Sequence, residues 1–449
     1  MDLLSPLISI SPIDGRYYQK CSELSKYFSE AALIKYRIFV EIEYFIALKN
    51  LNIPELQSLD ISKLTKIREL YDRDMLKTAK EVKKIEETTK HDIKALEYFI
   101  KNYFKEISLE EYSEFIHFGL TSQDINNTAI PLLFKDAIMD IYRPLLDNII
   151  DKLSKCSYNY NNTVVLARTH GQPASPTILG KEFLVFIKRL KEQLKLFSQI
   201  PFSAKFSGAT GNFNSLYLAY PDIDWFDFAD KFINDNLKLH RSHPTTQIEH
   251  YDNFAAQCDT LKRINTILID FCQDIWLYIS LNYFKQKINK DEVGSSAMPH
   301  KVNPIDFENA EGNLKLANAI FNFLSDKLPV SRLQRDLTDS TVLRNIGVPI
   351  AHTIISMKSI LQGLDKLTVN REAINIDLNN NAAVITEGLQ TMLRKIKYKN
   401  PYEKFKELSR VNKNIKLEDI YNFIDTLDID SELKQKLKTI TPNNYYGKH

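Results

Sequence analysis

The chain has 449 residues, 44% of them hydrophobic, which is enough to bury a sizeable core and favours two or three domains. Its 59 lysines and arginines nearly balance its 57 aspartates and glutamates, so the net charge gives no reason to expect a nucleic-acid or membrane partner. Residues 1–18 carry no basic region ahead of a long apolar run, and no window approaches the roughly 20 apolar residues of a membrane span. We therefore expect a folded, cytoplasmic protein.

The cysteines give no sign of a disulfide framework. Cys21, Cys156, Cys258 and Cys272 are widely spaced, without a CxxC pair or a metal-ligand spacing. This pattern is typical of reduced, mostly buried thiols. We expect neither a metal site nor a bound cofactor.

Long helices are predicted in the middle of the chain. Apolar residues recur at three- and four-residue steps over 134–153, 183–197 and 254–279, which indicates helices with a buried stripe. Pro144 is expected only to kink the first of them.

Glycine and proline mark the ends of further helices. Neither occurs between residues 244 and 294, which allows a helix of more than ~50 Å at about 1.5 Å per residue. Pro304 predicts the start of a helix over 305–327, and another is expected over 340–363 with Pro349 inside it. The fold class is therefore predicted as all-α.

Three domains are expected: an N-terminal helical domain over 1–120, a central long-helix bundle over 121–364 and a C-terminal helical domain over 365–449. The central helices also carry apolar residues on a second side, more than one small bundle can cover, which favours oligomerisation. The residues on that side are Leu133, Ala137, Tyr142, Leu146 and Ile150.

The segment Gly294–Pro304 combines a glycine that lets the backbone bend with paired hydroxyls, a lysine and an amide. Such a loop can close over an anionic ligand. A Ser-rich connector between helices is the alternative, and it explains a Gly-Ser-Ser tripeptide but not the whole segment.

Four other blocks place hydrogen-bonding residues beside apolar helix: 88–92, 117–124, 168–174 and 334–344. Each block alone is weak evidence, because an isolated histidine or arginine is often a cap or a solvated charge. His170 stands out, since the turn-forming residues after it can let its imidazole project into a cleft.

The loop at 294–304 closely resembles the signature loop of the fumarase/aspartase superfamily of lyases. The order and content of all the blocks, with the opening segment Ser11–Tyr17, resemble the bacterial branch of the adenylosuccinate lyases over nearly the whole chain. The resemblance implies a homotetramer whose active sites are shared by three subunits. It also implies release of fumarate from adenylosuccinate, giving AMP, and from succinylaminoimidazole carboxamide ribotide, giving the free carboxamide, in purine biosynthesis.

This β-elimination needs a base beside the carbon-bound proton and an acid for the departing amine. With the resemblance, Ser295 is predicted as the base and His170 as the acid, although the choice of Ser295 over Ser296 stays open. Glu308 would orient the imidazole. The donors expected to stabilise the doubly charged carboxylate are Lys301, Asn303 and Ser296.

The nucleotide contacts follow from the resemblance. Lys90 departs from it, since asparagine is usual before the His-Asp pair, which puts the substrate contact there in doubt. Catalysis is expected not to depend on the region after Gly388. The predicted substrate-binding residues are Arg16, Tyr17, Lys90, His91, Asp92, His117, Thr121, Ser122, Gln247, Ser296, Asn303, Asn309, Arg335, Ser340, Thr341 and Arg344.

Two other functions remain open. A superfamily lyase acting on a smaller amino-acid-derived substrate would keep Ser295, Lys301 and His170 without needing the phosphate-binding arginines. A non-enzymatic helical scaffold of the same fold, as known from lens crystallins, would keep the bundle and could lose the acid or the base.

Overall fold

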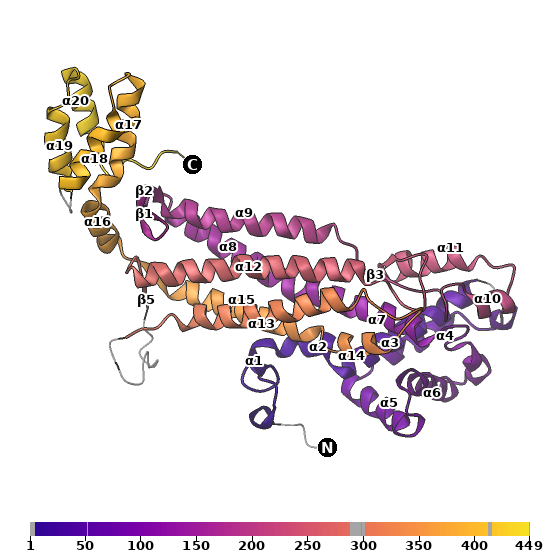
Figure 1. Ribbon diagram of the computed structural model, residues 1–449. Coiled ribbons are helices and arrows are strands. Elements are labelled where there is room, and N and C mark those ends of the chain that lie inside the picture. Colours follow the sequence, from indigo (N-terminus) through magenta and orange to yellow (C-terminus); the bar gives the residue numbers. More distant parts are fainter. Residues whose placement is uncertain (1–4, 52, 288–297, 299–300, 412–414, 449) are drawn as a thin grey trace. The chain divides into compact units, whose positions relative to one another are not determined.

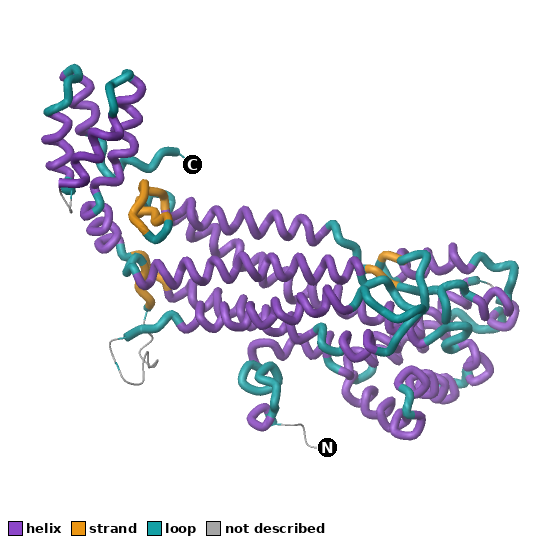
Figure 2. The backbone as a smooth tube through the Cα atoms, in the orientation of Figure 1, coloured by secondary structure: helices purple, strands orange, loops and turns teal. Residues whose placement is uncertain are grey.

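The computed structural model describes residues 5–51, 53–287, 298, 301–411 and 415–448. Helices dominate this part of the chain, and the strands are short (Figure 2), so the predicted all-α fold class is confirmed. None of the described helices is long and apolar enough to cross a membrane. The strands form three two-stranded sheets: β1 (Val164–Thr169) with β2 (Gln172–Ile178), β3 (Ser203–Ala204) with β4 (His240–Arg241), and β5 (Phe284–Gln286) with β6 (Leu367–Val369).

The chain divides into two compact units. Unit 1 comprises 1–146, 193–266 and 312–358, and unit 2 comprises 147–192, 267–311 and 359–449. The three-domain division stays a prediction. Five long helices contribute residues to both units: α8 (Arg143–Asn159), α9 (Leu179–Ser198), α12 (Asp252–Ser280), α13 (Ile305–Lys327) and α15 (Gly347–Lys366).

Unit 1 is built around α3, whose start is fixed by Ser29, since its Oγ accepts a hydrogen bond from Ala32 N–H at 3.1 Å. α3 is apolar on nearly all sides, and aromatic residues such as Tyr44 and Phe45 are fully buried in the core. Helices of this unit are labelled in Figure 1: α1 (Tyr18–Cys21), α2 (Ser25–Phe28), α3 (Glu30–Asn50), α4 (Ser62–Asp72), α5 (Met75–Thr89), α6 (Asp92–Glu106), α7 (Ser122–Ala137), α10 (Asn214–Ala219), α11 (Trp225–Asp230) and α14 (Thr338–Leu343).

The predicted helix over 134–153 lies in a longer helical stretch. α7 passes through a π-helical turn, Ile138–Tyr142, directly into α8. Pro144 is the second residue of α8, immediately after that turn. Because proline has no N–H and crowds the preceding turn, the wider π turn accommodates it without ending the helix.

α12 is shorter than the sequence allowed. It has 29 residues, which at about 1.5 Å per residue is ~43 Å, less than the more than ~50 Å that the absence of glycine and proline allowed. The chain leaves the helix at Asn282, which has a left-handed φ of 60°, and then forms β5. The end of this helix thus comes from an asparagine turn and a strand, without glycine or proline.

α13 spans Ile305–Lys327 as predicted. The single helix predicted over 340–363 is wrong, because α14 ends at Leu343 and α15 begins at Gly347. Pro349 is therefore in the first turn of α15, where its missing N–H breaks no intrahelical hydrogen bond.

The apolar residues that were expected to form an exposed second face of the central helices are buried. Leu133, Ala137, Tyr142, Leu146 and Ile150 are all at most 5% exposed within the single chain. They contribute to its own core, so they give no argument for oligomerisation. Large apolar side chains are exposed elsewhere on the long helices, at Leu184, Val185, Leu196, Trp276, Leu277, Leu316 and Phe323.

Unit 2 contains the β1–β2 hairpin and a group of C-terminal helices with a small core of their own. Leu389, Ile420 and Leu437 are fully buried in that core. The thiols are all free, and only Cys156 among them is partly exposed. The C-terminal helices are α16 (Arg371–Asn380), α17 (Thr386–Lys395), α18 (Pro401–Val411), α19 (Leu417–Asp425) and α20 (Ser431–Lys438).

Candidate active site

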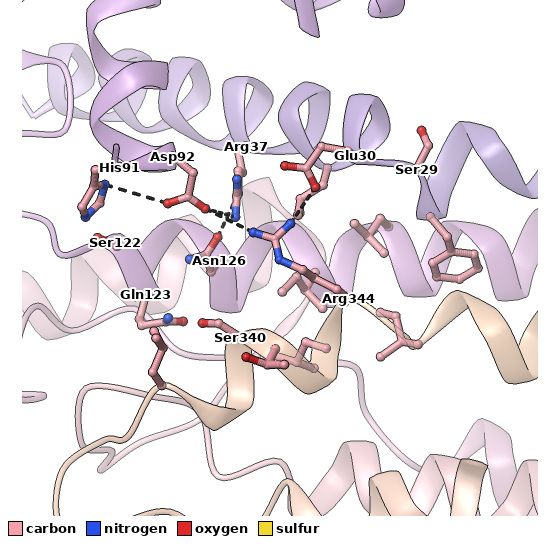
Figure 3. Close-up of a pocket in the computed structure, with 18 of the residues that line it drawn as sticks. Ser29, Glu30, Arg37, His91, Asp92, Ser122, Gln123, Asn126, Ser340 and Arg344 are labelled. Atoms are coloured by element: carbon pink, nitrogen blue, oxygen red, sulfur yellow. Dashed lines mark hydrogen bonds and ion pairs between the residues drawn. The ribbon is translucent and has the colours of Figure 1, made fainter. Parts of the chain in front are cut away.

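Unit 1 contains a pocket of about 570 Å³, within the range of about 300–1,000 Å³ for small-molecule sites. Its polar side chains come from α3, from the start of α6, from the start of α7 and from α14 (Figure 3). The pocket brings together eight of the predicted site residues: Lys90, His91, Asp92, Ser122, Arg335, Ser340, Thr341 and Arg344.

A network of ion pairs forms one wall of this pocket (Figure 3). Asp92 Oδ2 accepts a hydrogen bond from Arg37 Nη2 at 2.9 Å and lies 3.7 Å from Arg344 Nη2. Arg344 Nη1 also donates to Glu30 Oε2 at 2.6 Å. Burial alone would raise the pKa of Asp92, but the two guanidinium groups hold it below its usual value. Asp92 is therefore ionised and fixed in place.

His91 caps α6. The backbone N–H of Lys94 donates to His91 Nδ1 at 3.2 Å, so this nitrogen is an acceptor and the proton of the neutral ring lies on Nε2. The His91 side chain is 55% exposed, which leaves Nε2 available to a ligand. Lys90, just before it, has a left-handed φ of 51° that ends α5.

The start of α7 is anchored by a buried ion pair. Asp124 Oδ2 accepts a hydrogen bond from Thr121 N–H at 2.9 Å, and Asp124 Oδ1 lies 2.7 Å from Lys205 Nζ. The same oxygen accepts from the N–H groups of Ser207 and Gly208. Both charged side chains are fully buried. Thr121 and Ser122 are thereby tied to the loop at 205–208.

Arg335 is fixed by polar neighbours on two segments. Its Nη2 donates to Ser340 Oγ at 2.9 Å and its Nη1 to Gln247 Oε1 at 3.3 Å. Asp339 lies 3.6 Å from this guanidinium and accepts a hydrogen bond from Tyr251 OH at 3.2 Å. Arg335 Nε is buried and donates to no group in the described part of the chain. This nitrogen therefore has no hydrogen-bond partner among the described residues.

His117 is in the same unit but does not line the pocket. Its Nδ1 lies 2.6 Å from Oε1 of Glu41, a fully buried carboxylate on α3. Burial would lower the pKa of His117, but the charge of Glu41 raises it above the usual value. This ion pair couples α3 to the segment before α7.

The His117–Glu41 pair predicts a pH-dependent contribution to stability. Because the folded pKa of His117 is raised, the stabilisation is full below the unfolded value of about 6.5 and is lost as pH rises through the folded pKa. His117→Asn is expected to lower the free energy of unfolding by about 1.5–3 kcal/mol at pH 6, and by less at pH 9. Urea unfolding at both pH values measures this. A deficit equal at pH 6 and pH 9 would contradict it, and exposed His240→Asn is the control.

Arg16 and Tyr17 also belong to unit 1 and are outside the pocket lining. They lie in the turn that precedes α1, with Arg16 exposed and Tyr17 half-buried. Their predicted role in substrate binding stays a prediction.

The remaining predicted residues belong to unit 2. His170 is exposed at the tip of the β1–β2 hairpin, and with Gly171 it forms a two-residue loop in which both φ angles are positive, 54° and 71°. This is the pattern of a type I′ hairpin turn, which histidine tolerates better than most residues. His170 thus lies at the end of an element, and the expectation that its imidazole projects into a cleft stays a prediction.

Glu308 and its neighbours lie at the start of α13. Glu308 Oε1 accepts a hydrogen bond from Trp276 Nε1 at 3.0 Å. Within the described part of a single chain, Glu308 forms no hydrogen bond or ion pair with His170. Asn309 Oδ1 accepts from Ser359 at 3.1 Å. Lys301 and Asn303 precede the helix, and Lys301 N–H donates to Met298 O at 3.0 Å.

Ser295 and Ser296 lie outside the described residues. Sequence reasoning missed several charged groups that fix the pocket and the segment before α7. Arg37 and Glu41 carry a signal, since they are charges four residues apart within the apolar run of α3. Asp124 also carries a sequence signal, because an acidic residue three positions after a threonine is typical of a capping box at a helix start. Nothing local marks Lys205.

Comparisons with known proteins match the chain over nearly its whole length. The family described as Lyase matches residues 15–320, and the family described as Adenylosuccinate lyase C-terminal matches 331–446. The adenylosuccinate lyase of Dictyostelium discoideum is 54% identical, covering 99% of this chain and 97% of that protein. The adenylosuccinate lyase of Legionella pneumophila (strain Corby) is 46% identical with the same coverage.

The fold also matches a solved structure. The fumarate lyase of Mesorhizobium sp. BNC1 superposes with a TM-score of 0.74, at 18% identity and over 95% of both chains. At this identity the likeness supports the fold alone, whereas the sequence matches extend over nearly the full length. The chain belongs to the adenylosuccinate lyase family, within the fumarase/aspartase superfamily of lyases.

Proposed function

We propose that this chain cleaves adenylosuccinate to AMP and fumarate, and succinylaminoimidazole carboxamide ribotide to its free carboxamide and fumarate. The observation that carries the proposal is the 54% identity to an adenylosuccinate lyase over 99% of the chain. The unit 1 pocket supports it, because it combines arginines suited to a phosphate with hydroxyls and the imidazole of His91.

The phosphate is proposed to bind to Arg335, Ser340 and Arg344, with Arg16 and Tyr17 completing the contact. Arg335 supports this role because its guanidinium is preorganised by Ser340 and Gln247 and retains a buried donor at Nε. Lys90 and the N-terminal end of α7 at Ser122 add positive potential, and Thr341 adds a neutral hydroxyl.

The elimination is proposed to use Ser295 as the base, acting as an alkoxide, and His170 as the acid that protonates the departing amine. As the proton leaves carbon, the adjacent carboxylate gains a second charge, which Lys301, Asn303 and Ser296 would stabilise. The carbon–nitrogen bond then breaks, and the amine nitrogen takes the proton of the His170 imidazolium. Ser296 remains the alternative base.

The active site is proposed to be shared between subunits of a homotetramer. In support, His170 is exposed at a hairpin tip, and its proposed orienting partner Glu308 is exposed and bonded to Trp276 instead. The exposed apolar residues of α9, α12 and α13 give a surface for association. Mixing the strongly impaired Ser295→Ala and His170→Gln proteins should then raise activity above that of either variant alone as subunits exchange. No recovery in verified hybrids would argue against sharing.

The first test measures fumarate released by the purified protein from adenylosuccinate, argininosuccinate, aspartate and malate. Release from adenylosuccinate alone is expected, with a loss of at least about 10³-fold in kcat for Ser295→Ala. Release from another substrate only would favour the smaller-substrate lyase. No release by a folded tetramer would favour the scaffold.

A further inference from the structure

The C-terminal helices contact the β1–β2 hairpin at several points within unit 2. Arg168, two residues before His170, donates from Nη2 to Asp377 Oδ2 on α16 at 2.6 Å. Tyr283 OH donates to the same oxygen, and Asn381 Nδ2 donates to Asp377 Oδ1 at 3.0 Å. Asp377 is thus the centre of a polar cluster that joins β1 to α16.

A second contact holds the other strand. Ser175 Oγ donates to Glu387 Oε2 on α17, and Tyr445 OH donates to the same oxygen at 2.9 Å. Ser175 lies where the strand register shifts, because two residues of β2 oppose one residue of β1 between the Leu166–Pro176 and Arg168–Pro173 pairs. The bulge frees the Ser175 side chain from the regular alternation of the strand.

The C-terminal tail is closely packed at this point. A Cβ on Gly388 would lie 2.6 Å from the ring of Tyr445, so only glycine lets the ring approach α17 this closely. Burial, followed by the hydrogen bond to Glu387, raises the pKa of Tyr445 to about 12, so the hydroxyl remains a donor. The tail is therefore docked by both shape and hydrogen bonding.

From these contacts we infer that Asp377, Glu387 and Tyr445 form a positioning clamp for the hairpin that carries His170. A two-stranded hairpin is marginally stable alone, so its tip needs external contacts to hold one position. A displacement of about 1 Å at a catalytic group can reduce the rate by about 10²-fold. The inference rests on the proposed role of His170, and it runs against the expectation that catalysis does not depend on the region after Gly388.

The test uses the full-length protein and two measurements. Asp377→Ala is expected to speed hydrogen exchange of the peptide covering 164–178 and to lower kcat about 10- to 100-fold, with KM changed little. Asp377→Glu should restore most of kcat, because it keeps the charge that faces Arg168. Tyr445→Phe removes one hydroxyl and should have a smaller effect in the same direction. Glu403→Gln, at an exposed acid of α18, is the matched control.

The outcomes separate the clamp from the acid assignment. In a His170→Gln background, Asp377→Ala should cause no further fall in kcat, since the clamp acts through His170. Unchanged exchange in Asp377→Ala, or faster exchange with wild-type kcat, would overturn the clamp. A wild-type kcat for His170→Gln alone would instead overturn the assignment of the acid. An effect of Glu403→Gln equal to that of Asp377→Ala would also overturn the clamp, because it would reflect general destabilisation.

Discussion

Lys205→Met is expected to lower the free energy of unfolding by about 3–5 kcal/mol, because it leaves the buried carboxylate of Asp124 without its cation. The two groups are 2.7 Å apart, and neither side chain is exposed. Lys205 Nζ also donates to Gly208 O at 2.6 Å, so the substitution leaves a carbonyl unpaired as well. Urea unfolding at a fixed protein concentration measures the change.

Two variants separate this effect from the loss of any lysine. Adding Asp124→Asn to Lys205→Met removes the uncompensated charge while keeping an acceptor for Thr121 N–H, so part of the stability should return. Lys188→Met breaks an exposed pair with Glu192 on α9 and should leave the unfolding midpoint unchanged. A Lys205→Met midpoint equal to that of Lys188→Met would refute the proposed cost.

The helices that the sequence predicted well are those whose ends are set by local chemistry. α13 begins after Pro304 and ends before Pro329, and both limits follow from proline geometry. The limits of α12 and α15 were missed. The chain leaves α12 through a left-handed asparagine, and the segment between α14 and α15 has no glycine or proline before Gly347. The end of α12 has no strong local signal, whereas Pro349 in the first turn of α15 is a start signal that was placed inside a longer helix.

The apolar residues of the central helices illustrate a second limit. A helical period tells which residues share a side, but not what covers that side. Leu133 and Ile150 were assigned to a surface because one small bundle cannot bury two sides, yet both are buried within the single chain. More elements pack on these helices than the sequence pattern alone indicates. Periodicity therefore cannot tell whether an apolar side is covered by the same chain or by another subunit.

The sequence predicted the polar residues that line the pocket but not the buried ion pairs that support them. His91, Asp92, Arg335 and Arg344 are recognisable because they lie in dense polar motifs, and the structure brings them together. Lys205 pairs with a residue 81 positions away, a separation at which sequence carries no geometric information. Supporting residues of this kind are found only once the fold is known.

Arg335→Met is expected to reduce kcat/KM for adenylosuccinate about 10²- to 10⁴-fold, because the two charge-assisted hydrogen bonds proposed to the phosphate would contribute about 1.5–3 kcal/mol each. The side chain is only 20% exposed, and its position is fixed by Ser340 and Gln247, so little ordering is needed on binding. The kcat/KM of Arg335→Lys should lie between those of the wild-type protein and Arg335→Met, since lysine keeps the charge without the planar guanidinium. Steady-state fumarate release gives the values.

Succinyladenosine, which lacks the phosphate, distinguishes a phosphate contact from a structural role. If Arg335 binds the phosphate, the wild-type protein and Arg335→Met should cleave this substrate with similar kcat/KM, although both do so poorly. Arg332→Gln, in the same segment but 80% exposed, should behave as wild type on both substrates. An equal loss on both substrates for Arg335→Met would mean that Arg335 mainly holds Ser340 and Gln247 in place. The phosphate would then have to be bound by Arg344 and the residues around it.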